Sequence, residues 1–271
     1  MEKLLPATPS SADARGSARE AAAMSVAKGT YFLGLRFDSA SVESAICDIL
    51  AETDGRFKYV VTPNVHNMVQ LLENPTTLWP SYERAWRVFC DSRVLSRLAR
   101  LNGIRLPVVT GSDLTARIIA RLGELRLKIA VVGPPAAAGA ALESQYPGLD
   151  VLLHTPPMGF IASAQEVQKC VDFVVKAEAP LTFLAVGMPQ QMMLASRIAN
   201  HPRARGVGLC IGASIDFLTG KQRRAPVWIQ KAGFEWLHRL LSDPRRLASR
   251  YLLECPRIFY LVWWRRGRSR L

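Results

Sequence analysis

The sequence predicts an α/β protein in which a mostly parallel, doubly wound, Rossmann-like sheet is followed by a helical C-terminal appendage. Short apolar runs alternate with helical patterns over most of the chain, an order that is typical of parallel sheets. Apolar residues make up 49% of the 271 residues, which is enough to form a sizeable core. We expect a disordered leader at 1–29, an α/β domain at 30–220 and a basic amphipathic helical appendage at 221–271.

The individual elements follow from apolar runs of strand length and from helical periodicity between them. A helix is expected over Ser41–Ala51, and another over Ser163–Lys176 with Ser163 as its N-cap and Glu166 completing a capping box. Seven runs are expected to form strands: Phe57–Val61, Trp86–Cys90, Pro107–Val109, Lys128–Val132, Val151–His154, Leu181–Val186 and Gly208–Ile211.

Small, turn-forming or hydrogen-bonding residues follow most of these expected strands. In open α/β sheets, ligands bind outside the carboxyl ends of the strands. The sequence therefore predicts a polar cleft for a small molecule, with a nucleotide as the favoured ligand. The six segments are Thr62-Pro63-Asn64, Asp91-Ser92, Thr110-Gly111-Ser112-Asp113, Gly133-Pro134-Pro135, Gly187-Met188-Pro189-Gln190-Gln191 and Gly212-Ala213-Ser214-Ile215-Asp216.

Several common site motifs are missing from the sequence. It contains no GxGxxG, which argues against a nicotinamide-dependent oxidoreductase, and no GxxxxGK[ST] phosphate loop. It also lacks a DxD pair and a GxSxG elbow. The five cysteines are widely spaced and the four histidines show no ligand spacing, so we expect reduced thiols, no metal site and no cofactor.

The positive charge is concentrated near the C-terminus. Residues 221–271 contain thirteen Lys/Arg and three Asp/Glu, so they carry ten of the thirteen formal positive charges. Such a charge implies an anionic partner, which can be nucleic acid, lipid headgroups or phosphorylated substrates. A basic nucleic-acid-binding α/β protein is the alternative reading. It would need basic residues lining a groove with stacking aromatics, whereas here they gather at one end beside apolar residues.

The basic tail predicts contact with an anionic membrane surface. Basic residues alternate there with aromatics, most clearly at Trp263, Trp264, Arg265 and Arg266, a composition that suits a helix at a membrane interface. The alternative is a helix packed on the domain, which fits Trp228 and Trp236 better. Because no apolar run reaches the roughly 20 residues of a spanning helix and no signal peptide is recognisable, we expect a cytoplasmic protein, peripheral on the inner face of the cell membrane.

A long motif near the C-terminus carries a family resemblance. Segment 212–250 resembles the C-terminal signature of the WecG/TagA/CpsF glycosyltransferases (glycosyltransferase family 26), and four earlier blocks agree with this family in order. The signature residues are Gly212, Asp216, Gly220, Arg224-Ala225-Pro226, Gly233-Phe234-Glu235-Trp236, Arg239-Leu240 and Pro244-Arg245-Arg246. The earlier blocks are Thr62-Pro63-Asn64, Asp91, Thr110-Gly111-Ser112-Asp113 and Gly187–Gln191.

The resemblance implies an inverting transfer in surface polysaccharide biosynthesis. The donor would be a UDP-sugar carrying a hexose or an N-acetylhexosamine-type sugar, and the acceptor a polyprenyl-diphosphate-linked sugar. Three places depart from the family pattern: Val108 stands where an arginine is frequent, Met192 where a glutamate is frequent, and Ser249-Arg250 where a pair of arginines is frequent. The sequence does not fix the oligomeric state, and a homo-oligomer is compatible with it.

The resemblance and the expected positions at strand ends assign roles to individual residues. Asp91 is expected to be the catalytic base, the alternative being an N-cap of the helix at Ser92–Leu101. Thr62 and Asn64 are expected to contact the donor sugar or place the acceptor, the alternative being turn chemistry beside Pro63. The residues expected to bind substrate are Gly111, Asp113, Gly133, Gln191, Asp216, Arg224, Arg239, Arg246 and Arg250.

Each expected substrate contact has a structural alternative. Gly111 and Gly133 would let backbone N–H groups approach the diphosphate, or would serve only as tight turns. Gln191 would bind uracil or sugar hydroxyls, or be an exposed first-turn helix residue. Asp113 can cap a helix and Asp216 can hold the C-terminal loop. The arginines at 239, 246 and 250 would share one face of a continuous helix, or form a solvated basic surface.

Overall fold

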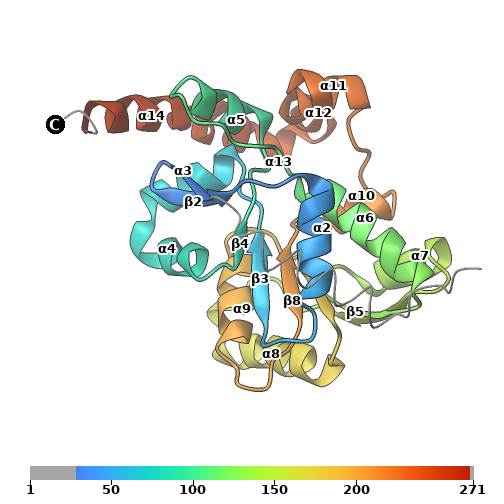
Figure 1. Ribbon diagram of the computed structural model, residues 1–271. Coiled ribbons are helices and arrows are strands. Elements are labelled where there is room, and N and C mark those ends of the chain that lie inside the picture. The colour runs from blue at the N-terminus through green and yellow to red at the C-terminus, as the bar shows by residue number, and fades with distance from the viewer. Residues whose placement is uncertain (1–28, 269–271) are drawn as a thin grey trace, which may run out of the picture.

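A computed structural model describes the backbone of residues 29–268 and the side chains of residues 29–264. The expected leader, apart from Gly29, and the side chains of Arg265 and Arg266 therefore lie outside the described residues. The main sheet has six strands in the order β4-β3-β8-β7-β5-β6 (Figure 1). Every pair of neighbouring strands is parallel, as the sequence predicts. The strands are β3 (Lys58–Val61), β4 (Arg87–Val88), β5 (Lys128–Val132), β6 (Asp150–His154), β7 (Leu181–Leu184) and β8 (Val207–Cys210).

Helices cover both faces of this sheet, so the expected doubly wound arrangement is confirmed. Side chains alternate between the faces along each strand: Tyr59 and Val61 of β3 belong to one core cluster, and Val60 belongs to the other. One face is covered by α3 (Val65–Glu73), α4 (Pro75–Glu83), α5 (Arg93–Arg100), α8 (Ala164–Ala177) and α9 (Gln190–Ala199). The other is covered by α2 (Val42–Ala51), α6 (Gly111–Glu124) and α7 (Ala136–Gln145).

A two-stranded antiparallel sheet precedes the main sheet, and the sequence analysis missed it. It consists of β1 (Gly29–Phe32) and β2 (Leu35–Asp38). Asp38 at its end is buried, where its carboxylate accepts hydrogen bonds from the backbone N–H of Val88, 2.8 Å away, and from Arg36. This carboxylate therefore fastens the small sheet to the edge strand β4.

One expected strand is wrong and one is much shorter than predicted. Residues 107–109 form only an isolated bridge between Val108 and Cys90. Pro107 has no N–H to donate to a ladder, which explains why pairing does not extend. Of the expected strand at 86–90, only Arg87 and Val88 are assigned to β4. Both deviations occur at the edge of the sheet, where pairing is available on one side only.

The expected N-cap of α8 is confirmed, whereas the side chain of Glu166 does not serve the predicted capping box. Ser163 Oγ accepts a hydrogen bond from the backbone N–H of Glu166. The Glu166 carboxylate forms an ion pair with Lys169 at 2.6 Å.

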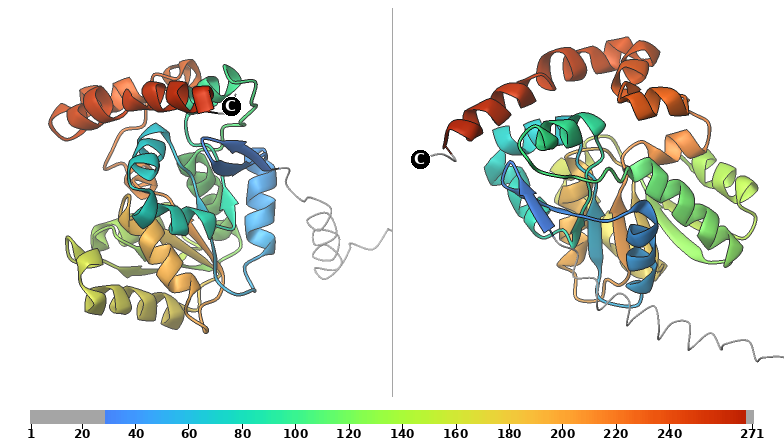
Figure 2. Two further views of the ribbon diagram at one scale, coloured as in Figure 1. Left: turned by 90° about the vertical axis from the view of Figure 1, so that its left-hand side faces the viewer. Right: turned by 45° about the horizontal axis from the view of Figure 1, so that its top comes forward.

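The C-terminal elements lie on the side of the molecule to which the carboxyl ends of the strands point (Figures 1 and 2). They contact α3 through one of its faces: Glu254 accepts hydrogen bonds from His66 at 2.9 Å and Gln70 at 3.1 Å, and Arg257 pairs with Glu73 at 3.1 Å. The elements are α10 (Ser214–Leu218), α11 (Val227–Ala232), α12 (Glu235–Ser242), α13 (Pro244–Ala248), the π-helical η2 (Ser249–Glu254) and α14 (Arg257–Arg268).

The last helix is packed through one side only. Ile258 and Val262 of α14 are buried in the core cluster that contains α3, whereas Phe259, Tyr260 and Trp263 are exposed. None of the helices among the described residues has the length and apolar character that crossing a membrane requires.

Candidate active site

Three neighbouring strands deliver side chains to one point beside Gly111. A Cβ atom on Gly111 would lie 2.8 Å from Thr62 Oγ1, 3.6 Å from Asp91 Oδ2 and 3.8 Å from Ser214 Oγ. Thr62 follows β3, Asp91 follows β4 and Ser214 follows β8, and these three strands are adjacent in the sheet. The carboxyl edge of a parallel sheet is the expected place for a ligand site, and here it carries a carboxylate and two hydroxyl groups.

Gly111 is the first residue of α6, and the structure gives a reason for a glycine there. A side chain would overlap Thr62 Oγ1, because real Cβ atoms do not approach other atoms to 2.8 Å. Because Gly111 has no side chain, the side chains of Thr62 and Asp91 can lie close to its backbone. Whether a diphosphate also approaches this backbone stays a prediction.

Asp91 does not cap the helix that follows it. The N-cap of α5 is Ser92, whose Oγ accepts a hydrogen bond from the backbone N–H of Leu95 at 3.2 Å. The capping alternative for Asp91 is therefore wrong. Its backbone N–H donates to the Pro63 carbonyl oxygen at 3.0 Å, which fixes the loop after β4 to the loop after β3. The Asp91 carboxyl group is left to face the cavity.

The surroundings of Asp91 make it an unusually strong base for a carboxylate. Burial is the largest cause that raises the pKa of Asp91, and together with the negative charges of Glu235 and Asp113 it brings this pKa to about 8. The backbone N–H of Gly111 and the guanidinium of Arg239 act in the opposite direction. A general base works best when its pKa lies near the working pH, so Asp91 is suited to taking a proton from a hydroxyl group.

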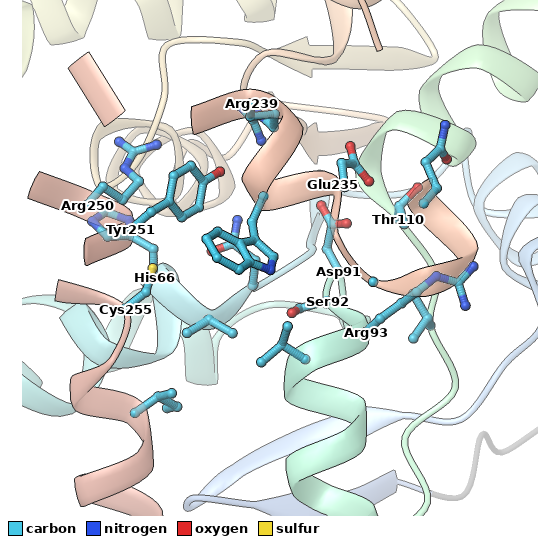
Figure 3. A pocket seen from close by; sticks show the side chains of 18 of the residues that line it. His66, Asp91, Ser92, Arg93, Thr110, Glu235, Arg239, Arg250, Tyr251 and Cys255 are labelled. Atoms are coloured by element: carbon cyan, nitrogen blue, oxygen red, sulfur yellow. The ribbon is translucent and has the colours of Figure 1, made fainter. Parts of the chain in front are cut away.

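A cavity of about 350 Å³ opens between the strand ends and the C-terminal helices (Figure 3). Of the residues expected to form the site, Asn64, Asp91, Asp113, Arg239 and Arg250 line it. The first three come from the body of the fold, and the two arginines come from α12 and η2. The site is thus assembled from segments that lie more than a hundred residues apart in the sequence.

Other lining residues were not among the expected site residues. Glu235 and Trp236 belong to the motif 233–236, so a signal for them was present in the family resemblance. Tyr251 and His66 had no recognisable signal. The Trp236 and Tyr251 rings pack against each other with centroids 6.1 Å apart and planes tilted by 50°. They form an aromatic wall beside the carboxylates of the cavity.

Asn64 has a structural role besides its position at the cavity. It is the N-cap of α3: its Oδ1 accepts from the backbone N–H of Asn67, while Asn67 Oδ1 accepts from the backbone N–H of Asn64. These reciprocal hydrogen bonds agree with the alternative role in the turn beside Pro63 that was given for Asn64. They also hold its side chain at the end of β3. Since the carboxamide oxygen is engaged, the NH₂ group is the part of Asn64 that can serve a ligand.

Asp113 and Arg224 form an ion pair at the rim of the cavity. Arg224 Nη1 donates to Asp113 Oδ1 at 2.7 Å, and Nη2 lies 3.5 Å from Thr110 Oγ1. The N-cap of α6 is Thr110, whose Oγ1 accepts from the backbone N–H of Asp113. The expectation that Asp113 itself caps a helix is therefore wrong. Its carboxylate holds the loop that leads into α11.

Six expected substrate-binding residues do not line this cavity: Gly111 and Arg224, whose contacts are given above, and four others whose observed contacts are also structural. Gln191 is 7% exposed, not an exposed helix residue, and its Oε1 accepts from the backbone N–H of Gly212 at 2.9 Å. Gly133 has φ +128°, and a Cβ there would lie 2.8 Å from the Ala185 carbonyl group. Asp216 lies 3.4 Å from Lys221 Nζ, and Arg246 pairs with Asp243.

The expected continuous arginine face is also wrong. The helix that carries Arg239 ends at Ser242, and Pro244 begins α13, which is followed by the π-helical turn. Because the axis changes at each of these breaks, the spacing of seven and four residues no longer places the arginines in line. Arg239 and Arg250 reach the cavity, whereas Arg246 does not.

The described residues contain no group of three or more His, Cys, Asp or Glu side chains that could hold a metal ion. The five cysteines are free thiols, and Cys90, Cys170 and Cys210 are buried. Burial raises the pKa of Cys90 to about 12, so this thiol beside Asp91 stays protonated and unreactive.

A comparison with protein-family models agrees with the family resemblance of the sequence motif. The model described as the glycosyl transferase WecG/TagA/CpsF family matches residues 30–271. This match spans the sheet, the strand-end residues and all of the C-terminal helices that close the cavity. The chain therefore belongs to the WecG/TagA/CpsF family of glycosyltransferases.

Proposed function

We propose that the protein is an inverting glycosyltransferase of surface polysaccharide biosynthesis. It moves a hexose or N-acetylhexosamine-type sugar from a UDP-sugar to a polyprenyl-diphosphate-linked sugar. The observation that carries the proposal is the position of Asp91: a carboxyl group with its pKa raised to about 8, at the carboxyl edge of the sheet and inside a cavity lined by three arginines.

The reaction is a single in-line displacement. The acceptor hydroxyl gives its proton to Asp91 while its oxygen forms a bond to the anomeric carbon of the donor. The bond from that carbon to the diphosphate oxygen breaks on the opposite face, and its electron pair leaves with UDP. Attack opposite to the leaving group inverts the configuration at the anomeric carbon.

The arginines of the C-terminal helices are suited to the leaving diphosphate. Arg239 and Arg250 line the cavity and have no carboxylate partner among the described ion pairs, whereas Arg224 is held by Asp113. Pairing a guanidinium with phosphate oxygens stabilises the charge that develops as the bond breaks. Thr62 lies beside Asp91 near Gly111, a position suited to orienting the acceptor hydroxyl.

The exposed side of α14 supports docking at the cytoplasmic surface of an anionic membrane. Phe259, Tyr260 and Trp263 are exposed there, and Trp264 is 41% exposed, while Ile258 on the other side is buried. An apolar aromatic face together with a basic composition is typical of helices that lie in a membrane interface. The packed-helix alternative is wrong for Trp228, which is 71% exposed, and Trp236 belongs to the cavity.

The proposal is tested with purified protein and a panel of UDP-sugars in the presence of a polyprenyl-diphosphate-linked acceptor. We expect UDP release that requires both substrates, and a product whose anomeric configuration, measured by NMR, is opposite to that of the donor. Retention of configuration would refute the displacement mechanism. UDP release from none of the sugars, with acceptor present, would refute the proposed donor class.

The nucleic-acid alternative is tested by sedimentation at physiological salt. We expect the protein to sediment with anionic liposomes and to leave duplex DNA in solution. Binding to DNA without binding to liposomes would favour the alternative and contradict the membrane-associated function.

A further inference from the structure

A second carboxylate meets Asp91 inside the cavity. Glu235 is the first residue of α12, and Asp91 follows β4, so the two groups come from segments that are far apart in the chain. Both line the cavity, and Figure 3 shows their carboxyl groups side by side. The charge of Glu235 is the strongest electrostatic influence on Asp91.

Glu235 is not neutralised by an ion pair. It is half-buried, and no salt bridge within the described part of the chain includes it. Arg239 lies one turn further along α12, but its guanidinium carbon lies 5.5 Å from the centroid of the Phe217 ring. Placing a half-buried carboxylate beside another one costs stability. Such a cost at a cavity wall indicates a functional role.

Among the described charged groups that face Asp91, Glu235 is the negative charge that an ion pair does not compensate. Asp113 of α6 is paired with Arg224, so its charge is largely compensated. Arg239 of α12 and the backbone N–H of Gly111 favour the ionised form of Asp91. Arg93 of α5 and Arg250 of η2 also line the cavity, as does His66 of α3, whose pKa is lowered by burial. Among the described ion pairs none includes Glu235, so its negative charge opposes these arginines.

We propose that Glu235 is a positioning residue for the transfer: its carboxylate, brought to Asp91 by the C-terminal helices, makes Asp91 the group that accepts the proton of the acceptor hydroxyl. This inference rests on the proposed function. Without Glu235, burial would still raise the pKa of Asp91, but the backbone N–H of Gly111 and the guanidinium of Arg239 would lower it with less opposition, so Asp91 would be a weaker base. With it, the pair binds a proton more tightly, so proton transfer from the hydroxyl becomes more favourable as the new bond forms.

The docking of α12 therefore adjusts the base as well as closing the cavity. Arg97 of α5 donates to the carbonyl oxygen of Ala232 at 3.0 Å, and Ala232 lies two residues before Phe234, the N-cap of α12. The Arg224–Asp113 pair holds the preceding loop. Both contacts fix the start of α12, and with it Glu235, against the body that carries Asp91.

The test compares the wild type with Glu235→Gln and Glu235→Asp by the pH dependence of kcat/KM for transfer. Glu235→Gln keeps the shape and removes the charge, so we expect the acidic limb to move to lower pH by about one unit and the plateau to fall by roughly tenfold. Glu235→Asp keeps the charge and should retain the position of the limb. The matched control is Glu124→Gln, an exposed glutamate at the opposite end of α6 from Gly111.

A second measurement does not depend on turnover. Titration of the Asp91 carboxyl carbon by ¹³C NMR, assigned by its loss in Asp91→Asn, should show a lower midpoint in Glu235→Gln than in the wild type. Coincident midpoints and coincident pH profiles in these two proteins would overturn the inference. A shifted midpoint in a protein that transfers no sugar would support the carboxylate pair and refute the proposed function alone.

Discussion

Arg224 Nη1 donates to Asp113 Oδ1 across 2.7 Å and so joins two residues that are 111 positions apart in the sequence. The pair connects the N-terminal turn of α6, which holds Gly111 against Thr62, to the loop that leads into the C-terminal helices. Two motifs of the family resemblance are therefore one structural unit. The hydrogen bond couples the body of the fold to the segment that closes the cavity.

The first prediction concerns the strength of this pair. Both side chains are partly exposed, so a double-mutant cycle with Arg224→Gln and Asp113→Asn should give a favourable, measurable coupling free energy of unfolding that does not exceed about 1 kcal/mol. The measurement is urea unfolding at pH 7. The Arg117–Glu43 pair, in which both side chains are exposed, is the matched control and should give a smaller coupling energy. A zero coupling energy for Arg224 and Asp113 would contradict the connecting role.

The pH dependence of this coupling has a defined sign. Burial raises the pKa of Asp113, but hydrogen bonds from Arg224 and Thr110 outweigh it, so the pKa is lowered overall. A lowered pKa gives stability that is fully present above the unfolded value of about 4 and is lost as pH falls through the lower folded value. The coupling measured at pH 7 should therefore disappear under strongly acidic conditions.

The second prediction concerns removal of the base. Asp91→Asn should reduce the transfer rate by roughly 10²- to 10⁴-fold, because an amide cannot accept the proton. Binding of UDP, measured by calorimetry, should change little, since Asp91 acts on the acceptor. Transfer within a few fold of the wild type would show that Asp91 is not the base. A loss of UDP binding would place Asp91 at the donor instead.

The same substitution should make the folded protein more stable at alkaline pH. Because burial raises the pKa of Asp91 to about 8, the folded state binds its proton more tightly than the unfolded state does. The wild type therefore loses this contribution to stability as pH rises from about 4 through the folded value. Asp91→Asn has no such loss. The difference in free energy of unfolding between Asp91→Asn and the wild type should therefore change in favour of the variant as pH rises from about 5 to about 9.

The third prediction concerns the glycine at the start of α6. Gly111→Ala places a methyl group 2.8 Å from Thr62 Oγ1, so the Thr62 side chain or the start of α6 must move. We expect a loss of about 1–3 kcal/mol in unfolding free energy and a marked fall in transfer rate, because Asp91 lies at the same point. Gly55→Ala is the control, since its nearest neighbour would be 3.8 Å away. Equal activities of these two variants would argue against the point beside Gly111, where Thr62 and Asp91 meet, as the reaction centre.

The fourth prediction concerns the exposed aromatics of α14. The double variant Phe259→Ala with Trp263→Ala should sediment with anionic liposomes at least several-fold less than the wild type, because interfacial binding scales with buried apolar area. Its thermal unfolding should be unchanged, since neither side chain is in the core. Met158→Ala removes an exposed apolar side chain elsewhere and should bind as the wild type does. Unchanged binding of the double variant would exclude this face as the membrane contact.

Three strands, among them the edge strand β6, were predicted well because each is a compact apolar run. The expected strand at 128–132 is β5 without any change of bounds, and those at 151–154 and 208–211 differ from β6 and β8 by one residue at one or both ends. The β4 edge of the sheet was predicted less well. Pairing at an edge depends on partners that the local sequence does not reveal, such as Val88 bound to the Asp38 carboxylate. The small sheet that supplies this carboxylate was missed for the same reason.

The candidate site shows a similar division between body and C-terminal segment. Asp91, Asn64 and Gly111 were predicted from their place after apolar strands, and the structure brings them to the same edge. Gln191 and Asp216 had the same signal, but their side chains bind the chain itself. Polar residues at strand ends can serve a ligand or the loop, and the choice depends on which atoms lie within hydrogen-bonding distance.

The sequence by itself determined the parallel α/β fold and the family, and it predicted Asp91 as the catalytic carboxylate, because apolar periodicity and motif spacing are local properties. Only the tertiary structure decided which C-terminal residues join that carboxylate. The breaks at Ser242 and Pro244 turn Arg246 away while Arg239 and Arg250 reach the cavity, and the docking of α12 sets Glu235 beside Asp91. Contacts between segments more than a hundred residues apart depend on how helices pack, and the spacing along the chain does not contain that information.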